Sequence, residues 1–235
     1  MKKIYTLCMG ILCISQINAQ FKVGQKLVGP SLGIGFSTDD RETNTMNNTS
    51  VNNRNTDAFS IALGVSSIKM KNERTGLGFG LTYGFDNNKI SDKSTSTYEY
   101  SFNRHTVGAS VFKRKFIPIK GKWNFYYDAG LNAFISTAKS ITTYSNIAGS
   151  TTDKGNAYRA GLFITPGITY QLKNNLILEG AFTNIFSGGY TLENSNSENT
   201  NGDKFKNKRS FADINSTLNA NDFFRNITIS LRWMM

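Results

Sequence analysis

The chain contains a single histidine, His105, and histidine is the side chain most often used as a general base near neutral pH. Nucleophilic catalysis would need a hydroxyl or thiol held within hydrogen-bond reach of that base. No such spacing accompanies His105, and its sequence parity is that of Val107 and Val111, which predicts a position on the apolar face or the rim of its segment. We therefore expect His105 to be a structural or incidental histidine, and the protein to be no enzyme, with no catalytic residue, metal or cofactor.

Four charged residues stand out because they lie within segments of otherwise apolar and small polar residues: Asp128, Arg159, Glu179 and Arg232. Each falls on the polar parity of its segment, opposite the apolar face. Charges that leave water must be paired or remain hydrated, because an isolated buried charge is very costly. Two hypotheses follow, a salt-bridge network that plugs an enclosed space and a pathway for ions. Both hypotheses require secondary-structure elements that place residues distant in the sequence on the same face of a sheet.

The last segment, residues 223–233, shows how such a face is built. From Ile227 onward its odd positions are apolar and end on Trp233, whereas its even positions are polar and include Arg232. Successive residues of a β-strand point to opposite faces. The segment is therefore predicted to be a strand with one apolar and one polar face.

Seven earlier segments repeat this alternation. With the last one, the predicted strands are residues 26–37, 57–69, 75–86, 104–116, 123–138, 156–172, 176–187 and 223–233. Their connections alternate between long polar stretches and short turns, the long ones being residues 38–56, 87–103, 139–155 and 188–221. This pattern predicts an all-β fold, an eight-stranded antiparallel up-and-down transmembrane β-barrel with tight turns at one end and flexible, hydrated loops at the other.

An eight-stranded barrel has an interior just wide enough to be filled by side chains. The rows of Gly, Ser, Ala and Thr on the polar parity suit such a narrow interior. Tyr126, Phe134 and Phe163 are predicted to fill it beside the four charges. A soluble barrel with its apolar face inward is the alternative fold, but its surface would then carry almost no Lys or Glu in the first three strands.

The first residues read as an export signal. Lys2 and Lys3 precede a short apolar run, and Ala19 offers a small residue for cleavage, which predicts a cleavable signal peptide at 1–19 and a barrel domain at 20–235. Both cysteines lie within the signal, so the mature chain forms no disulfide. The mean hydropathy of −0.34 excludes a helical membrane protein.

The mature chain is basic, since 27 basic residues become 25 against 16 acidic ones without Lys2 and Lys3, a formal balance of +9. For an exported protein this favours lipid headgroups and lipopolysaccharide phosphates as partners over nucleic acid. Candidates for lipopolysaccharide contact lie in the last polar stretch: Lys204, Lys206, Lys208 and Arg209. A solvated charge run explains them equally well. A second basic group surrounds the short turns and is predicted to contact phospholipid headgroups: Lys69, Lys71, Arg74, Lys113, Arg114, Lys115, Lys120, Lys122 and Lys173.

The strand alternation, the connection lengths and the aromatic-ended final strand resemble the small eight-stranded outer-membrane barrels of Gram-negative bacteria, the OmpA/OmpX-like family. The resemblance covers nearly all of the mature chain, without a periplasmic peptidoglycan-binding domain. It implies a monomer in the cell outer membrane, exported by the general secretory pathway and inserted by the barrel assembly machinery. Trp123 and Trp233 would then form part of one membrane-interface girdle. Pro30 and Pro166 depart from the pattern, because proline cannot donate to a strand ladder.

The sequence thus predicts a porin-like fold but does not by itself determine the function. The hypothesis we favour is a non-enzymatic barrel with a structural or surface-interaction role through its long extracellular loops. The first alternative is a narrow pore for ions or small solutes, tuned by the inward charges. The second is a lipid-modifying enzyme, because an outer-membrane lipid A palmitoyltransferase is also an eight-stranded barrel with a histidine near its outer rim.

Overall fold

The computed structural model describes residues 21–44, 51–92, 98–144, 149–182, 185–216 and 227–235. The predicted signal peptide at 1–19 lies outside these residues. Within them, eight antiparallel strands form a closed ring, because β5 pairs with β6 as well as with β4. Around the ring the order is β5, β4, β3, β2, β1, β10, β7, β6. The predicted eight-stranded antiparallel up-and-down barrel is confirmed.

The strands are far longer than predicted at one end. Their bounds are β1 Lys26–Asn44, β2 Val51–Asn72, β3 Thr75–Asp92, β4 Tyr98–Lys120, β5 Trp123–Tyr144, β6 Gly149–Lys173, β7 Leu176–Phe182, β8 Phe186–Asn199, β9 Lys204–Ser216 and β10 Ile227–Met234. Most of the polar stretches 38–56, 87–103 and 139–155 are strand, so the prediction of long flexible loops there is wrong. Cross-strand hydrogen bonds continue through residues that lack any apolar alternation, because backbone pairing requires none.

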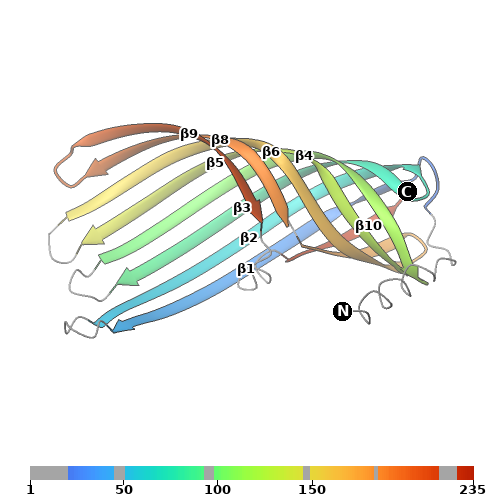
Figure 1. Cartoon of the computed structure of the whole chain (residues 1–235), viewed down its shortest axis with the longest axis horizontal. Helices are drawn as coiled ribbons and strands as arrows, with labels where there is room; N and C mark the ends of the chain where they lie inside the picture. The colour runs from blue at the N-terminus through green and yellow to red at the C-terminus, as the bar shows by residue number, and fades with distance from the viewer. Residues whose placement is uncertain (1–20, 45–50, 93–97, 145–148, 183–184, 217–226) are drawn as a thin grey trace, which may run out of the picture.

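The prediction of one long polar loop at 188–221 is also wrong. β8 and β9 form a hairpin there. β8 pairs with residues 151–164 of β6, so the hairpin adds two strands to the sheet at the long-hairpin end. Its turn contains Gly202 with φ of 84°, and Asn199 and Asp203 hydrogen-bond across it. Figure 1 shows this hairpin beside the other long hairpins, which all project to the same end of the barrel.

At the opposite end the strands are joined by two-residue turns at 73–74, 121–122 and 174–175. Each of these hairpins has a register shift beside its turn, such as the one between Pro118 and Lys120. Gly121 adopts a φ of 58°, a conformation that glycine accepts without steric cost. The C-terminus lies at this short-turn end (Figure 1).

Both problematic prolines lie where a ladder is interrupted. Pro30 keeps its place opposite Val65 on β2, but the pairing of β1 with β10 skips Gly29 and Pro30. Pro166 pairs with β5, and on its other side β6 exchanges β7 for β8, since those pairings end at Gly167 and Ile164. Proline has no N–H to donate, and Pro166 lies opposite the position where the predicted strand 176–187 is divided into β7 and β8.

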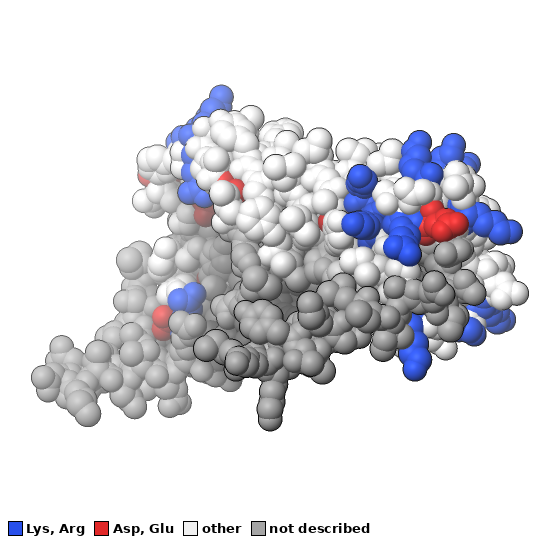
Figure 2. Space-filling view, turned by 45° about the vertical axis from the view of Figure 1, so that its right-hand side comes forward, with Lys and Arg blue, Asp and Glu red and all other residues white. Residues whose placement is uncertain are grey.

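The wall has an apolar outer surface and a mixed interior. Large apolar side chains on the outside are exposed along every long strand of the barrel, including Leu63, Tyr83, Val107, Ile135, Tyr158 and Leu192. Figure 2 shows Lys and Arg gathered at the two ends of the molecule, with few charged side chains between them. The inside-out arrangement excludes the soluble alternative, whose apolar face would point inward. No helix in the described residues is long and apolar enough to cross a membrane.

Candidate functional site: an ionic cluster that closes the lumen

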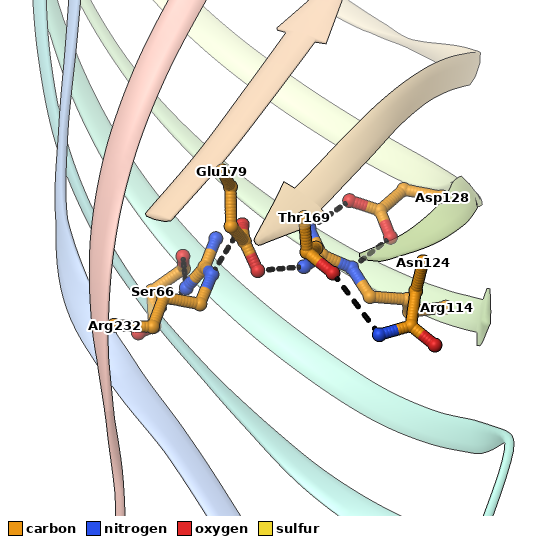
Figure 3. Close-up of polar contacts among 7 residues, drawn as sticks. All are labelled: Ser66, Arg114, Asn124, Asp128, Thr169, Glu179 and Arg232. Atoms are coloured by element: carbon orange, nitrogen blue, oxygen red, sulfur yellow. Dashed lines mark hydrogen bonds and ion pairs between the residues drawn. The ribbon is translucent and has the colours of Figure 1, made fainter. Parts of the chain in front are cut away.

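The lumen near the short-turn end is crossed by a cluster of four charged residues, Arg114, Asp128, Glu179 and Arg232, which we call the lumen cluster. Arg114 binds Asp128 with two parallel hydrogen bonds of 2.7 Å, from Nε and Nη2. Its third nitrogen, Nη1, donates to Glu179 at 2.6 Å. Glu179 also accepts from Arg232 Nε at 2.5 Å. Two positive and two negative charges therefore form one neutral, connected chain (Figure 3).

The barrel topology brings these residues together. Arg114 and Asp128 are direct cross-strand partners on β4 and β5, and Glu179 on β7 lies across the lumen from β4. Arg232 on β10 extends the chain to Ser66 on β2, donating to its hydroxyl at 2.7 Å. The cluster thus connects β2, β4, β5, β7 and β10, and it holds opposite walls of the ring at a fixed separation.

The cluster is dry. Arg114 and Glu179 each expose 1% of their surface, and Asp128 and Arg232 are also buried. The guanidinium of Arg114 lies over the ring of Tyr126, 3.8 Å from its centroid, which adds a cation–π contact. Breaking a buried ion pair by removing one partner leaves an uncompensated charge, so each member depends on the others.

Apolar layers seal the lumen on both sides of the cluster. Towards the short turns, Phe21 packs on Phe116 with 4.4 Å between ring centroids. Towards the long hairpins, Phe112 meets Phe163 edge-on at 6.3 Å. The inward glycines make room for these rings, since a Cβ on Gly78 would lie 2.4 Å from the ring of Phe112. Together the layers form a packed core: Phe21, Leu27, Ile68, Met70, Phe112, Phe116, Tyr126, Phe163, Ile177 and Ala181.

Sequence parity predicts Asp128, Glu179 and Arg232 in the interior, and the structure brings these three together. Arg159 does not join them. Arg159 lies nearer the long-hairpin end of the lumen. Its side chain is 30% exposed and forms an ion pair with Asp213 on β9 at 3.0 Å. Arg114 takes its place, so assigning Arg114 to the basic rim was wrong. The available signal was parity: Val107 and Val111 face outward, and Arg114 has the opposite parity on the same strand.

On the long-hairpin side of the aromatic layers, the lumen contains an open cavity of about 730 Å³. Its lining is mostly small or polar, with Phe134 and Arg159 among the larger side chains. Phe134, predicted as a filler, is half-buried here, whereas Tyr126 and Phe163 are buried in the seal. We call this space the vestibule.

The remaining predicted residues lie on the outer surface. Trp123 and Trp233 are both exposed at the short-turn end, where Trp123 packs on Tyr170. The group Lys204, Lys206, Lys208 and Arg209 lies on β9, not in a loop. Lys204 pairs with Glu198 at 3.7 Å, and Arg209 pairs with Glu193 at 2.9 Å.

His105 is exposed on the outward face of β4. Its Nδ1 hydrogen-bonds the hydroxyl of Tyr83 at 2.8 Å, and its ring lies 5.0 Å from that of Phe85. Both partners are aromatic residues of β3, the neighbouring strand. In the described part of the chain, no group of His, Cys, Asp and Glu side chains could hold a metal ion.

The similarity of this chain to known proteins is a similarity of structure. No family model and no curated protein matches the chain. It is similar to a major outer membrane protein from Thermus thermophilus, with a TM-score of 0.47 and 12% identity over 90% of this chain and 99% of that one. It is also similar to the outer membrane protein OprG from Pseudomonas aeruginosa, with a TM-score of 0.42 and 11% identity over 92% and 98% of the two chains. For Neisserial surface protein A the TM-score is 0.31, with 13% identity over 89% and 96%.

The class of protein follows from the barrel itself. Eight antiparallel strands close into a ring, and the outer surface is an apolar belt between two basic ends. Only structures that satisfy their backbone hydrogen bonds internally can cross a bilayer. The chain is thus an eight-stranded transmembrane β-barrel whose lumen is closed near one end.

Proposed function

We propose that this protein is a non-enzymatic outer-membrane barrel with a sealed lumen, and that it has a structural or surface-interaction role through its long hairpins. The observation that supports this most directly is the lumen cluster. Four charges that are paired, buried and enclosed by aromatic layers support a lumen that is closed to ions at this level. The hairpins and the vestibule remain as the parts that can meet another molecule.

The placement in the envelope is part of the proposal. The predicted export signal, the apolar belt and the basic ends support insertion in the outer membrane of a Gram-negative cell, with the short turns in the periplasm. The partners would be outer-membrane lipids, lipopolysaccharide and, during insertion, the barrel assembly machinery. The ring closes within a single chain, which supports a monomer. Membership of the OmpA/OmpX-like family stays a hypothesis.

Conductance in a planar bilayer tests the sealed lumen. We expect the folded wild-type protein, with insertion shown by heat-dependent gel mobility, to give no unitary current steps. The double variant Arg114→Ala/Asp128→Ala removes one pair and leaves Glu179 bound to Arg232. The variant leaves no unpaired charge and removes the guanidinium against which Phe112, Phe116 and Tyr126 lie, so both aromatic layers lose a packing partner and we expect the barrel to conduct.

The matched control is Arg159→Ala/Asp213→Ala, which removes an ion pair from the vestibule, where the lumen is already wide. We expect this variant to be as silent as the wild type. Stable steps in the wild type, with an ion selectivity that changes in the Arg114/Asp128 variant, would replace the sealed barrel by the alternative of a narrow pore.

A further inference from the structure

Three exposed lysines lie in one cross-strand row on the outer surface, above the apolar belt. Lys139 on β5 is the direct partner of Lys154 on β6, and Lys154 faces Asn196 on β8. Asn196 in turn faces Lys206 on β9. We call Lys139, Lys154 and Lys206 the outer lysine row. Lys206 also belongs to the group on β9 that the sequence suggested for lipopolysaccharide contact, whereas Lys139 and Lys154 come from other strands.

The row carries uncompensated charge. The three lysines form no ion pair with any residue that the structure describes. Nearby carboxylates have other partners, since Glu198 pairs with Lys204 and Asp153 accepts from Ser140 and Ser197. Like charges directly opposite each other on neighbouring strands are destabilising. An anion between Lys139 and Lys154 would remove this repulsion.

The surface around the row is hollowed. Two adjoining grooves of about 690 and 600 Å³ share Lys139, Lys154 and Asn196 as lining residues. Asn103 borders the first groove and Lys206 the second. Amide groups and ammonium groups together offer several donors to a phosphate, and lysine is a frequent phosphate ligand.

The height of the row identifies the source of the anion. Lys139 lies four residues beyond the exposed Ile135 on β5, and Lys154 lies four residues from the exposed Tyr158 on β6. Four residues of a strand span about 13 Å, and less along the membrane normal because the strands are tilted. The ammonium groups therefore lie just outside the hydrocarbon layer, at the level of lipid headgroups.

We propose that the outer lysine row binds the phosphate groups of a phosphorylated glycolipid in the surrounding leaflet. The inference rests on the membrane location given under the proposed function, but it is independent of whether the lumen conducts. It assigns a specific lipid contact to the wall formed by β5, β6, β8 and β9, and not to the basic rim at the short turns.

Native mass spectrometry of the barrel tests this. The protein is reconstituted with lipid A, which is bisphosphorylated, or with its dephosphorylated counterpart, then extracted and examined for retained lipid. We expect the wild type to retain the phosphorylated lipid, and Lys139→Gln/Lys154→Gln/Lys206→Gln to bind it on the order of tenfold more weakly. The control Lys113→Gln/Lys115→Gln removes exposed lysines of β4 nearer the short turns and should retain it like the wild type.

Equal loss in the two variants, or equal retention of the dephosphorylated lipid by the wild type, would overturn the proposal. A second measurement separates lipid binding from folding. In detergent without lipid A, the triple variant should be at least as stable as the wild type, because it loses only repulsion. A protein that fails to reconstitute as a heat-modifiable barrel would instead contradict the membrane location itself.

Discussion

Two of the arginine–aspartate pairs inside the barrel, Arg114–Asp128 and Arg159–Asp213, differ in what surrounds them. Arg114 and Asp128 are buried and belong to a hydrogen-bonded cluster that also includes Glu179 and Arg232. Arg159 and Asp213 form a pair at 3.0 Å in the vestibule, where both are partly exposed. The first pair is buried, so removing one member leaves an uncompensated charge, whereas the second pair is partly exposed and is screened by solvent.

This comparison shows that the structural role of an inward-facing charge in a small barrel depends on its position along the barrel axis. Near the short turns the ring is complete, and aromatic residues fill the space around the charges. At the long-hairpin end the wall is extended by β8 and β9, and the lumen is open to solvent. The same residue type therefore closes the lumen at one level and lines a hydrated space at another.

Removing the centre of the lumen cluster should have the largest effect. Glu179→Ala deprives both Arg114 and Arg232 of a carboxylate and leaves an excess of buried positive charge. We expect the free energy of unfolding to fall by about 3–5 kcal/mol, measured by urea unfolding of the protein in lipid vesicles. A loss no greater than that of Glu193→Ala, whose carboxylate pairs with the exposed Arg209, would contradict the role given to the cluster.

Double-mutant cycles compare the two pairs directly. For Arg114 and Asp128 we expect a coupling energy at the upper end of the range of about 0.5–3 kcal/mol seen for residues in contact. For Arg159 and Asp213 we expect about 0.2–1 kcal/mol, because solvent screens the partly exposed pair. Unfolding of the single and double alanine variants gives both values. Equal coupling in the two cycles would show that burial does not separate the pairs.

Two glycines of β3 sharpen the comparison without changing any charge. A Cβ at Gly78 would lie 2.4 Å from the ring of Phe112, so Gly78→Ala should overpack the seal and cost about 1–3 kcal/mol in the free energy of unfolding. At Gly84 the nearest atom would be 3.8 Å away, so Gly84→Ala should be neutral or stabilise by about 0.5 kcal/mol. Equal destabilisation by the two would indicate that the lumen is packed equally at both levels.

His105→Ala should have the smallest effect, because His105 belongs to neither interior region. It loses one exposed hydrogen bond to Tyr83, and we expect the free energy of unfolding to change by less than about 1 kcal/mol. Mass spectrometry of lipids incubated with either protein should show no new product. A product formed by the wild type and lost in the folded variant would revive the lipid-modifying enzyme.

The sequence by itself determined the barrel, the strand directions and the faces of the wall. Alternation with a period of two residues is a local property, and it is strong wherever one face meets lipid and the other meets the lumen. The same parity identified Asp128, Glu179 and Arg232 as inward residues, and it would have identified Arg114 had the basic residues near the short turns been separated by face.

Only the tertiary structure decided how far the strands extend and which inward charges meet. β8 is polar beyond Leu192 and the apolar residues of β9 are widely spaced, so no sustained apolar alternation reveals these strands; the pairing of β8 with β6 and of β9 with β8 defines them. The meeting of Arg114 with Glu179 depends on the register of several strands around the ring. The separation of Arg159 from that cluster depends on the same register, because each pairing shift changes the height of a residue in the lumen, and no local pattern encodes that height.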